Sequence, residues 1–186
     1  MDKFFGNLNL VLGTGFALAG VLMAVFHVDQ ANLSAVLQWL HVFFGVLWIG
    51  LLYYFNFVQA PVMPTVPAEL KPGVSKYIAP KALFYFRWGA ALTVLTGLIL
   101  AYVNGFEKEA LTFQDGFELI GTGMWLALVM AFNVWFIIWP NQKKVLGLVE
   151  ADDASKAAAA RTEMIASRTN VLLSIPMLYA MTAYRY

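Results

Sequence analysis

The stretch AVLQWLHVFFGVLWIGLLYYFNFV, residues 35–58, decides the fold class. Only Gln38, His41 and Asn56 interrupt its apolar run. A helix needs about 20 apolar residues to cross a bilayer, and this stretch supplies them. It therefore predicts a transmembrane helix that carries one histidine.

Four other apolar runs accompany this stretch, at residues 8–26, 82–103, 117–139 and 168–184. The last run has the shortest apolar part and extends backwards only through Met164 and Ile165. Charged residues make up only 12% of the chain, about half their share in a soluble domain. We therefore expect an all-α membrane bundle of about five transmembrane helices, forming a single domain over residues 1–186.

The lysines and arginines gather at alternate connections: Lys3, Lys71, Lys76, Lys81, Arg87, Lys143, Lys144, Lys156, Arg161 and Arg168. Only Lys108 and Arg185 lie elsewhere, and the connection 104–116 is acidic. Cationic loops stay in the cytoplasm. We therefore expect a cytoplasmic N-terminus, a periplasmic C-terminus and cytoplasmic loops at 59–81 and 141–167.

These two cationic loops differ in composition. Residues 59–81 contain five prolines: Pro61, Pro64, Pro67, Pro72 and Pro80. Because proline breaks a helix interior, we expect an ordered crossing segment there that is not a long helix. Residues 141–167 are rich in alanine, lysine and glutamate, which favour helix, so we expect them to extend the fourth and fifth helices.

The composition excludes several classes of site. The chain has no cysteine, so it cannot hold a disulfide, an iron–sulfur cluster or a covalent c-type haem. His27 and His41 are its two histidines, too few for a multi-histidine metal cage. It has no P-loop, Rossmann or HExxH motif. A net charge of +1 gives no basis for binding nucleic acid.

His41 is the principal candidate for a ligand, because it lies roughly 9 Å inside the second predicted span. A neutral imidazole is the usual axial ligand of a b-type haem. Gly45, one turn further on, would allow a flat ring to approach the backbone. Trp48 continues the same helix face. The alternative is a histidine that hydrogen bonds a neighbouring helix.

Other candidates each have a structural alternative. His27 is either a second ligand or an interfacial side chain reaching toward water. Met124, Met177 and Met181 lie at a depth suited to an axial ligand, although methionine in a bundle commonly serves packing. Arg87 either extends to the membrane surface or pairs with a carboxylate of a ligand.

Two patterns predict contacts between helices. Gly89, Thr93, Gly97 and Ala101 recur every four residues, and such a stripe of small residues allows close helix packing. Asn133 lies in the middle of the fourth span, where we expect it to hydrogen bond another helix.

Three stretches carry a family resemblance: LHVFFGVLWIGLLYYFNFVQAP (40–61), FNVWFIIWPNQKKVLG (132–147) and ASRTNVLLSIPMLYAM (166–181). Together they resemble the membrane domain of bacterial cytochrome c-linked urate oxidases, the urate oxidase N-terminal domain family. This resemblance implies the bacterial inner membrane and electron transfer to a cytochrome c. Family members carry their own cytochrome c domain; this chain has no cysteine, so a separate cytochrome c or a larger respiratory complex is the expected partner.

A more distant likeness is to the membrane-bound protoporphyrinogen oxidases, which also have a histidine early in a helix followed by a tryptophan, as His41 and Trp48 are here. Those enzymes have an intramembrane lysine on a later helix, and residues 123–136 contain none, which argues against the same chemistry. Both likenesses imply a haem b at His41.

Three functional hypotheses remain. The first is a haem-b-binding membrane electron-transfer subunit, an oxidoreductase component. The second is a cofactor-free accessory or anchoring subunit of a larger membrane complex. The third is a small transporter or channel lined by Asn133, Asn170 and His41. The lipid bilayer is an expected partner in all three, and a homo-oligomer is a further expectation.

Overall fold

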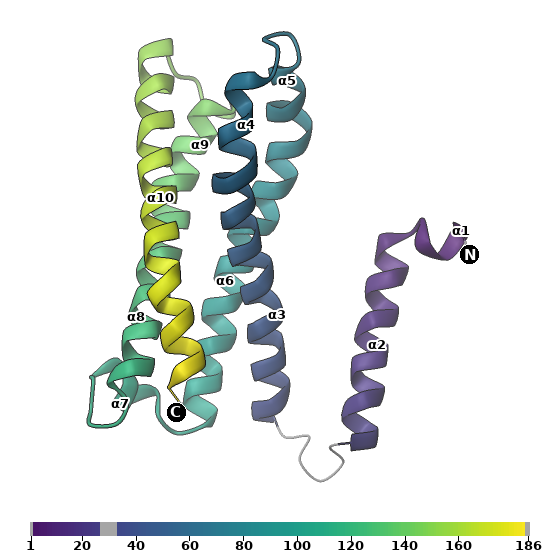
Figure 1. Ribbon diagram of the computed structural model, residues 1–186, viewed down its shortest axis with the longest axis vertical. Coiled ribbons are helices and arrows are strands. Elements are labelled where there is room, and N and C mark those ends of the chain that lie inside the picture. The colour runs from purple at the N-terminus through teal and green to yellow at the C-terminus, as the bar shows by residue number, and fades with distance from the viewer. Residues whose placement is uncertain (1, 27–32, 185–186) are drawn as a thin grey trace.

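The computed structural model describes residues 2–26 and 33–184 of the chain, and this part is helical without strands. Its main helices are α2 (Leu8–Phe26), α3 (Leu33–Tyr53), α6 (Ala79–Val103), α8 (Glu118–Phe132), α9 (Trp139–Val145) and α10 (Asp153–Ala183). In Figure 1, α3, α6, α8 with α9, and α10 lie side by side as a bundle, while α2 stands apart. The predicted all-α fold is confirmed.

Four helical segments among the described residues are long and apolar enough to cross a membrane: Leu8–Phe26, Leu33–Thr65, Lys71–Val103 and Glu118–Val145. The chain is therefore a multi-pass membrane protein by the length and composition of its helices. Helix α10 runs along the whole bundle beside them (Figure 1) but is more polar, because it carries Glu163, Arg168 and Asn170. A fifth span by α10 stays a prediction, as does the orientation in the membrane.

The proline-rich residues 59–81 are more helical than expected. Beyond α3, helical turns continue through a π-helical segment (Tyr54–Gln59), α4 (Ala60–Val62) and a 3₁₀ turn (Met63–Thr65). Before α6, the chain forms α5 (Lys71–Gly73) and a second π-helical segment (Val74–Ile78). Pro61, Pro64, Pro72 and Pro80 each occupy the first turn of one of these segments or of α6. A proline is tolerated there because its missing N–H would have no intrahelical partner. The non-helical connection shrinks to residues 66–70.

Residues 141–167 are largely helical, as their composition predicted. Helix α9 ends at Val145, and α10 already begins at Asp153. The side chain of Asp152 accepts a hydrogen bond of 2.7 Å from the backbone N–H of Ser155, which satisfies one of the free donors at the start of the helix. Helix α10 then continues without interruption through Pro176 to Ala183.

The small-residue stripe of α6 allows close packing against α3, as predicted. A Cβ added at Gly89 would lie 3.3 Å from the backbone nitrogen of Trp48, so the two helix backbones approach closely there. Trp48, Leu52 and Phe86 form part of the main apolar core with Met130 on α8. The small residues of α6 therefore lie at the position along the two helices where α3 and α6 approach most closely.

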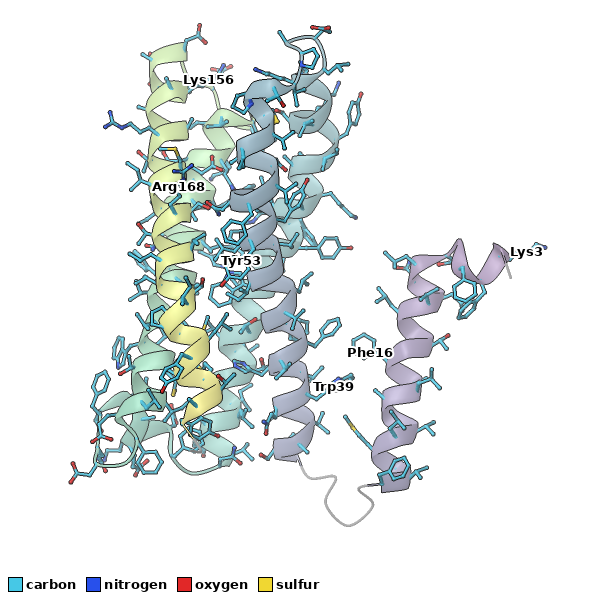
Figure 2. The ribbon with its side chains drawn as sticks, in the orientation of Figure 1. Lys3, Phe16, Trp39, Tyr53, Lys156 and Arg168 are labelled. Atoms are coloured by element: carbon cyan, nitrogen blue, oxygen red, sulfur yellow. The ribbon has the colours of Figure 1, made fainter. Side chains whose placement is uncertain are left out.

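Helix α2 contacts the bundle through aromatic rings. The ring of Phe16 lies 5.3 Å from each of the rings of Trp39 and Phe43 on α3, measured between centroids, and Figure 2 shows Phe16 between α2 and α3. No residue of α2 is buried. This helix therefore borders the bundle without contributing to its core.

The two ends of the bundle differ in charge. The end with α5, α9 and the start of α10 carries most of the lysines and arginines, including Lys156 (Figure 2); we call it the cationic end. The opposite end carries α7 (Glu107–Leu111), with Glu107 and Glu109, and is called the acidic end (Figure 1). The sequence predicts that the cationic end is cytoplasmic.

Candidate functional site

A cavity of about 500 Å³ lies between α3, α6, α8 and α10. Its volume is within the range of small-molecule sites, about 300–1,000 Å³. Apolar side chains form most of its lining. Among the predicted site residues, it brings together His41, Gly45, Trp48 and Met124.

The imidazole of His41 is held in one tautomer. Its Nδ1 lies 2.8 Å from the backbone carbonyl oxygen of Thr93. Because a carbonyl only accepts hydrogen bonds, Nδ1 carries the proton and donates. In the neutral imidazole, Nε2 is then the unprotonated nitrogen, and it has no hydrogen-bond partner among the described residues. Metal-ligating histidines are usually held in this way, with one nitrogen donating to a carbonyl and the other free to bind the metal.

Thr93 is itself fixed in place. Its hydroxyl donates to the carbonyl oxygen of Gly89 at 2.7 Å, and its carbonyl oxygen also accepts from the hydroxyl of Thr96 at 3.1 Å. The acceptor that orients His41 is therefore part of a buried hydrogen-bond network on α6.

Gly97 provides the space for the His41 ring. A Cβ added at Gly97 would lie 2.7 Å from Cε1 and 2.9 Å from Nδ1 of His41, closer than real atoms approach. A Cβ at Gly45 would make only an ordinary contact of 3.8 Å with Thr93. The sequence predicts the clearance at Gly45 and helix packing alone at Gly97. The sequence marks Gly97 only as a member of the small-residue stripe. The stripe does not show which side chain of another helix Gly97 faces.

Trp48, one of the residues that line the cavity, has an unpaired hydrogen-bond donor. Its side chain is fully buried, and its indole Nε1 has no hydrogen-bond partner in the described structure. Buried donors in native proteins nearly always have one. A ligand that placed an acceptor atom within hydrogen-bond distance of Nε1 would satisfy this donor.

Three thioethers also line the cavity, those of Met124, Met177 and Met181. Met124 comes from α8 and the other two from α10, so they approach from helices other than that of His41. A thioether is a known axial ligand of haem iron. Each of the three stays a candidate second ligand.

The structure places Arg87 outside the cavity lining. Its guanidinium lies over the ring of Trp139, 3.5 Å from the ring centroid, which is a cation–π contact. This contact connects α6 to α9. His27 lies outside the described residues.

The described residues contain no group of three or more histidine, aspartate or glutamate side chains that could hold a free metal ion. A haem brings four nitrogen ligands of its own and requires only one or two from the protein. The donor set around His41 therefore fits a haem better than a bare ion.

Residues 108–186 match the family described as urate oxidase N-terminal. The match includes the stretches 132–147 and 166–181, while 40–61, with His41, lies outside it. No curated protein and no solved structure matches the chain. The C-terminal part of this helical membrane bundle, residues 108–186, is thus similar to the urate oxidase N-terminal family, as the sequence predicted.

Proposed function

We propose that this chain is a haem-b-binding subunit that transfers electrons within a bacterial inner membrane. The observation that supports this most directly is the tautomer of His41: Nδ1 donates to Thr93, and Nε2 is left free beside an apolar cavity. A b-type haem needs such a nitrogen and a pocket that excludes water. Its iron supplies one-electron redox chemistry when bound.

The protein residues have separate parts in this proposal. His41 would hold the iron, and the carbonyl of Thr93 would orient the ring and increase its basicity as a ligand. Gly97 leaves room for the imidazole. The apolar lining and any second ligand, such as Met124, would set the reduction potential through burial and axial ligation.

The family match supports a relation to the urate oxidase membrane domain. We therefore propose a cytochrome c, alone or within a larger respiratory complex, as electron acceptor. The acidic end suits it, because Asn104 and Phe106 line the cavity next to Glu107. Acidic residues beside a redox site would attract a cytochrome with a cationic face.

The test is the visible absorbance spectrum of the purified full-length chain, as isolated and after reduction with dithionite. We expect b-type bands that sharpen on reduction in the wild type and are lost in His41→Ala. His27→Ala tests the second ligand: altered bands would assign His27 to the iron, and unchanged bands would identify it as an interfacial residue. A featureless wild-type spectrum after expression with ample haem would instead favour the cofactor-free accessory subunit.

A further inference from the structure

The inward face of α10 carries a row of polar side chains. They are Glu163, Ser167, Asn170 and Ser174, whose spacing of three or four residues places them on one face of the helix. Met177 and Met181, which follow at the same spacing, line the cavity. We call the four polar residues and their partners the polar row.

Each member of the row hydrogen bonds a side chain from another part of the bundle. Glu163 accepts from Gln142 (3.0 Å), Ser167 accepts from Asn56 (2.8 Å), Asn170 accepts from Asn133 (2.9 Å), and the hydroxyls of Ser174 and Tyr53 lie 3.0 Å apart. Asn170 and Ser174 are fully buried. The bond between Asn133 and Asn170 confirms the interhelical contact predicted for Asn133.

The polar row extends from the cationic end to the cavity. Glu163 lies in the half of α10 nearer the cationic end, and Tyr53, at mid-height in Figure 2, lines the cavity. Successive members are one helical turn apart, about 5.4 Å. A single water that hydrogen bonds both neighbours at about 2.8 Å each spans this distance.

Two buried acceptors, one of them on the partner of Glu163, are candidate binding places for internal water. The Oε1 atoms of Gln59 and Gln142 are buried and have no hydrogen-bond partner within the described part of the chain. Buried polar atoms of this kind are commonly satisfied by internal water. Gln142 is the residue that donates to Glu163, so such water would lie next to the carboxyl group.

Glu163 has the chemistry of a proton-binding group. Burial raises the pKa of its carboxyl above the ordinary value, and the hydrogen bond from Gln142 only partly opposes this. Among the described residues, no lysine or arginine forms an ion pair with it. Gln142, which is uncharged, is the group that faces it from α9.

We propose that Glu163 and the polar row conduct protons between water at the cationic end and the cavity. A proton from that water binds the carboxylate of Glu163, leaves to an adjacent internal water and passes from water to water along the row. The serine and tyrosine hydroxyls can relay it, and the asparagine amides only hydrogen bond the waters. No electron moves and no covalent bond between heavy atoms changes. This inference goes beyond the proposed function and does not require the haem.

The experiment uses the full-length, haem-free chain in liposomes that contain a pH-sensitive dye, with the membrane potential clamped by potassium and valinomycin. The cavity reaches the acidic end at Asn104, so the row and the cavity together cross the bundle. After an acid pulse we expect the wild type to collapse the pH gradient faster than protein-free liposomes. We expect Glu163→Gln to slow this collapse by about 10-fold or more, because it removes the proton-binding group.

The matched control is Glu150→Gln, which makes the same change in the exposed connection between α9 and α10 and should conduct as the wild type does. Tyr53→Phe removes one hydroxyl from the other end of the row and should also slow the proton flux. If circular dichroism shows that Glu163→Gln does not fold, Tyr53→Phe serves as the test. A wild type no faster than empty liposomes, or folded row variants that conduct normally, would overturn the proposal. Absorbance bands that persist in Glu163→Gln would show that haem binding is a separate property.

Discussion

Gly97 and His41 face each other across the α3–α6 contact so closely that a single methyl group on Gly97 would overlap the imidazole, 2.7 Å from its Cε1. The imidazole is therefore in tight steric contact with α6 on that side. On the same ring, Nδ1 is bound to Thr93. Two neighbouring turns of α6 thus determine both the position and the tautomer of His41.

Gly97→Ala should displace the imidazole from the carbonyl of Thr93. Overpacking of this kind destabilises a core by about 1–3 kcal/mol, and we expect weaker haem binding together with a lower melting temperature in detergent. Gly20→Ala is the control, since a Cβ there meets no atom within 4 Å. Haem titration of a folded Gly97→Ala protein with wild-type affinity would contradict the role of Gly97.

Trp48→Phe should weaken ligand binding with little effect on folding. The change removes a buried unpaired N–H, whose desolvation costs about 1–3 kcal/mol of folding free energy. Because this cost disappears, it offsets the stability lost with the larger ring's contacts. Haem affinity should fall by about 0.5–1.5 kcal/mol, the worth of one hydrogen bond. Thermal unfolding with and without haem measures both quantities.

Trp135→Phe is the matched control for Trp48. Its Nε1 is also buried without a partner, but Trp135 does not line the cavity. It should change stability alone. Equal losses of haem affinity in the two variants would mean that the Trp48 N–H does not contact the ligand.

Glu163 should make stability depend on pH. Because burial raises its pKa in the folded state above the value of 4.5 for an unperturbed glutamate, the folded chain binds more protons than the unfolded chain in the window above that pH. The free energy of unfolding should therefore fall as pH rises through the folded-state pKa. Denaturant unfolding in detergent at several pH values would measure this slope.

In Glu163→Gln this part of the slope should disappear, because glutamine keeps the shape and does not titrate. Glu150→Gln, in the exposed connection, should retain it. If Glu163→Gln and the wild type show the same pH dependence, the carboxyl is not desolvated in the folded protein.

Charge reversal at the acidic end should slow electron transfer to a cytochrome c with a cationic face. Glu107→Lys and Glu109→Lys replace attraction by repulsion, so the bimolecular rate constant at low salt should fall by about 10-fold, with less effect at high salt because exposed charges are screened. Stopped-flow oxidation of the reduced chain measures this. Glu69→Lys, in the short connection 66–70 at the cationic end, should leave the rate unchanged; an equal effect there would exclude the acidic end as the docking side.

The class of fold, the membrane-spanning length of four helical segments and the family resemblance, which the family match confirms over residues 108–186, all follow from the amino-acid sequence. These properties depend on composition and on spacing along one helix, which are local. The sequence also predicted His41 and Gly45, because apolar helices make a lone polar group or a glycine conspicuous, and Trp48 and Met124 by their helix face or depth relative to His41. All four line the cavity, and their part in binding a ligand stays a prediction. Residues 59–81 contain more helical turns than the prolines led us to expect, because a proline breaks a helix interior but fits a first turn.

Which side chains meet across helices is a property of the tertiary structure. It showed that Gly97 makes room for His41, that the carbonyl of Thr93 holds Nδ1, and that Arg87 lies over Trp139 instead of beside the cavity. It also aligned the polar face of α10 with partners on four other segments. Such contacts depend on the axial shift and rotation of one helix against another, and no spacing within a single helix specifies these.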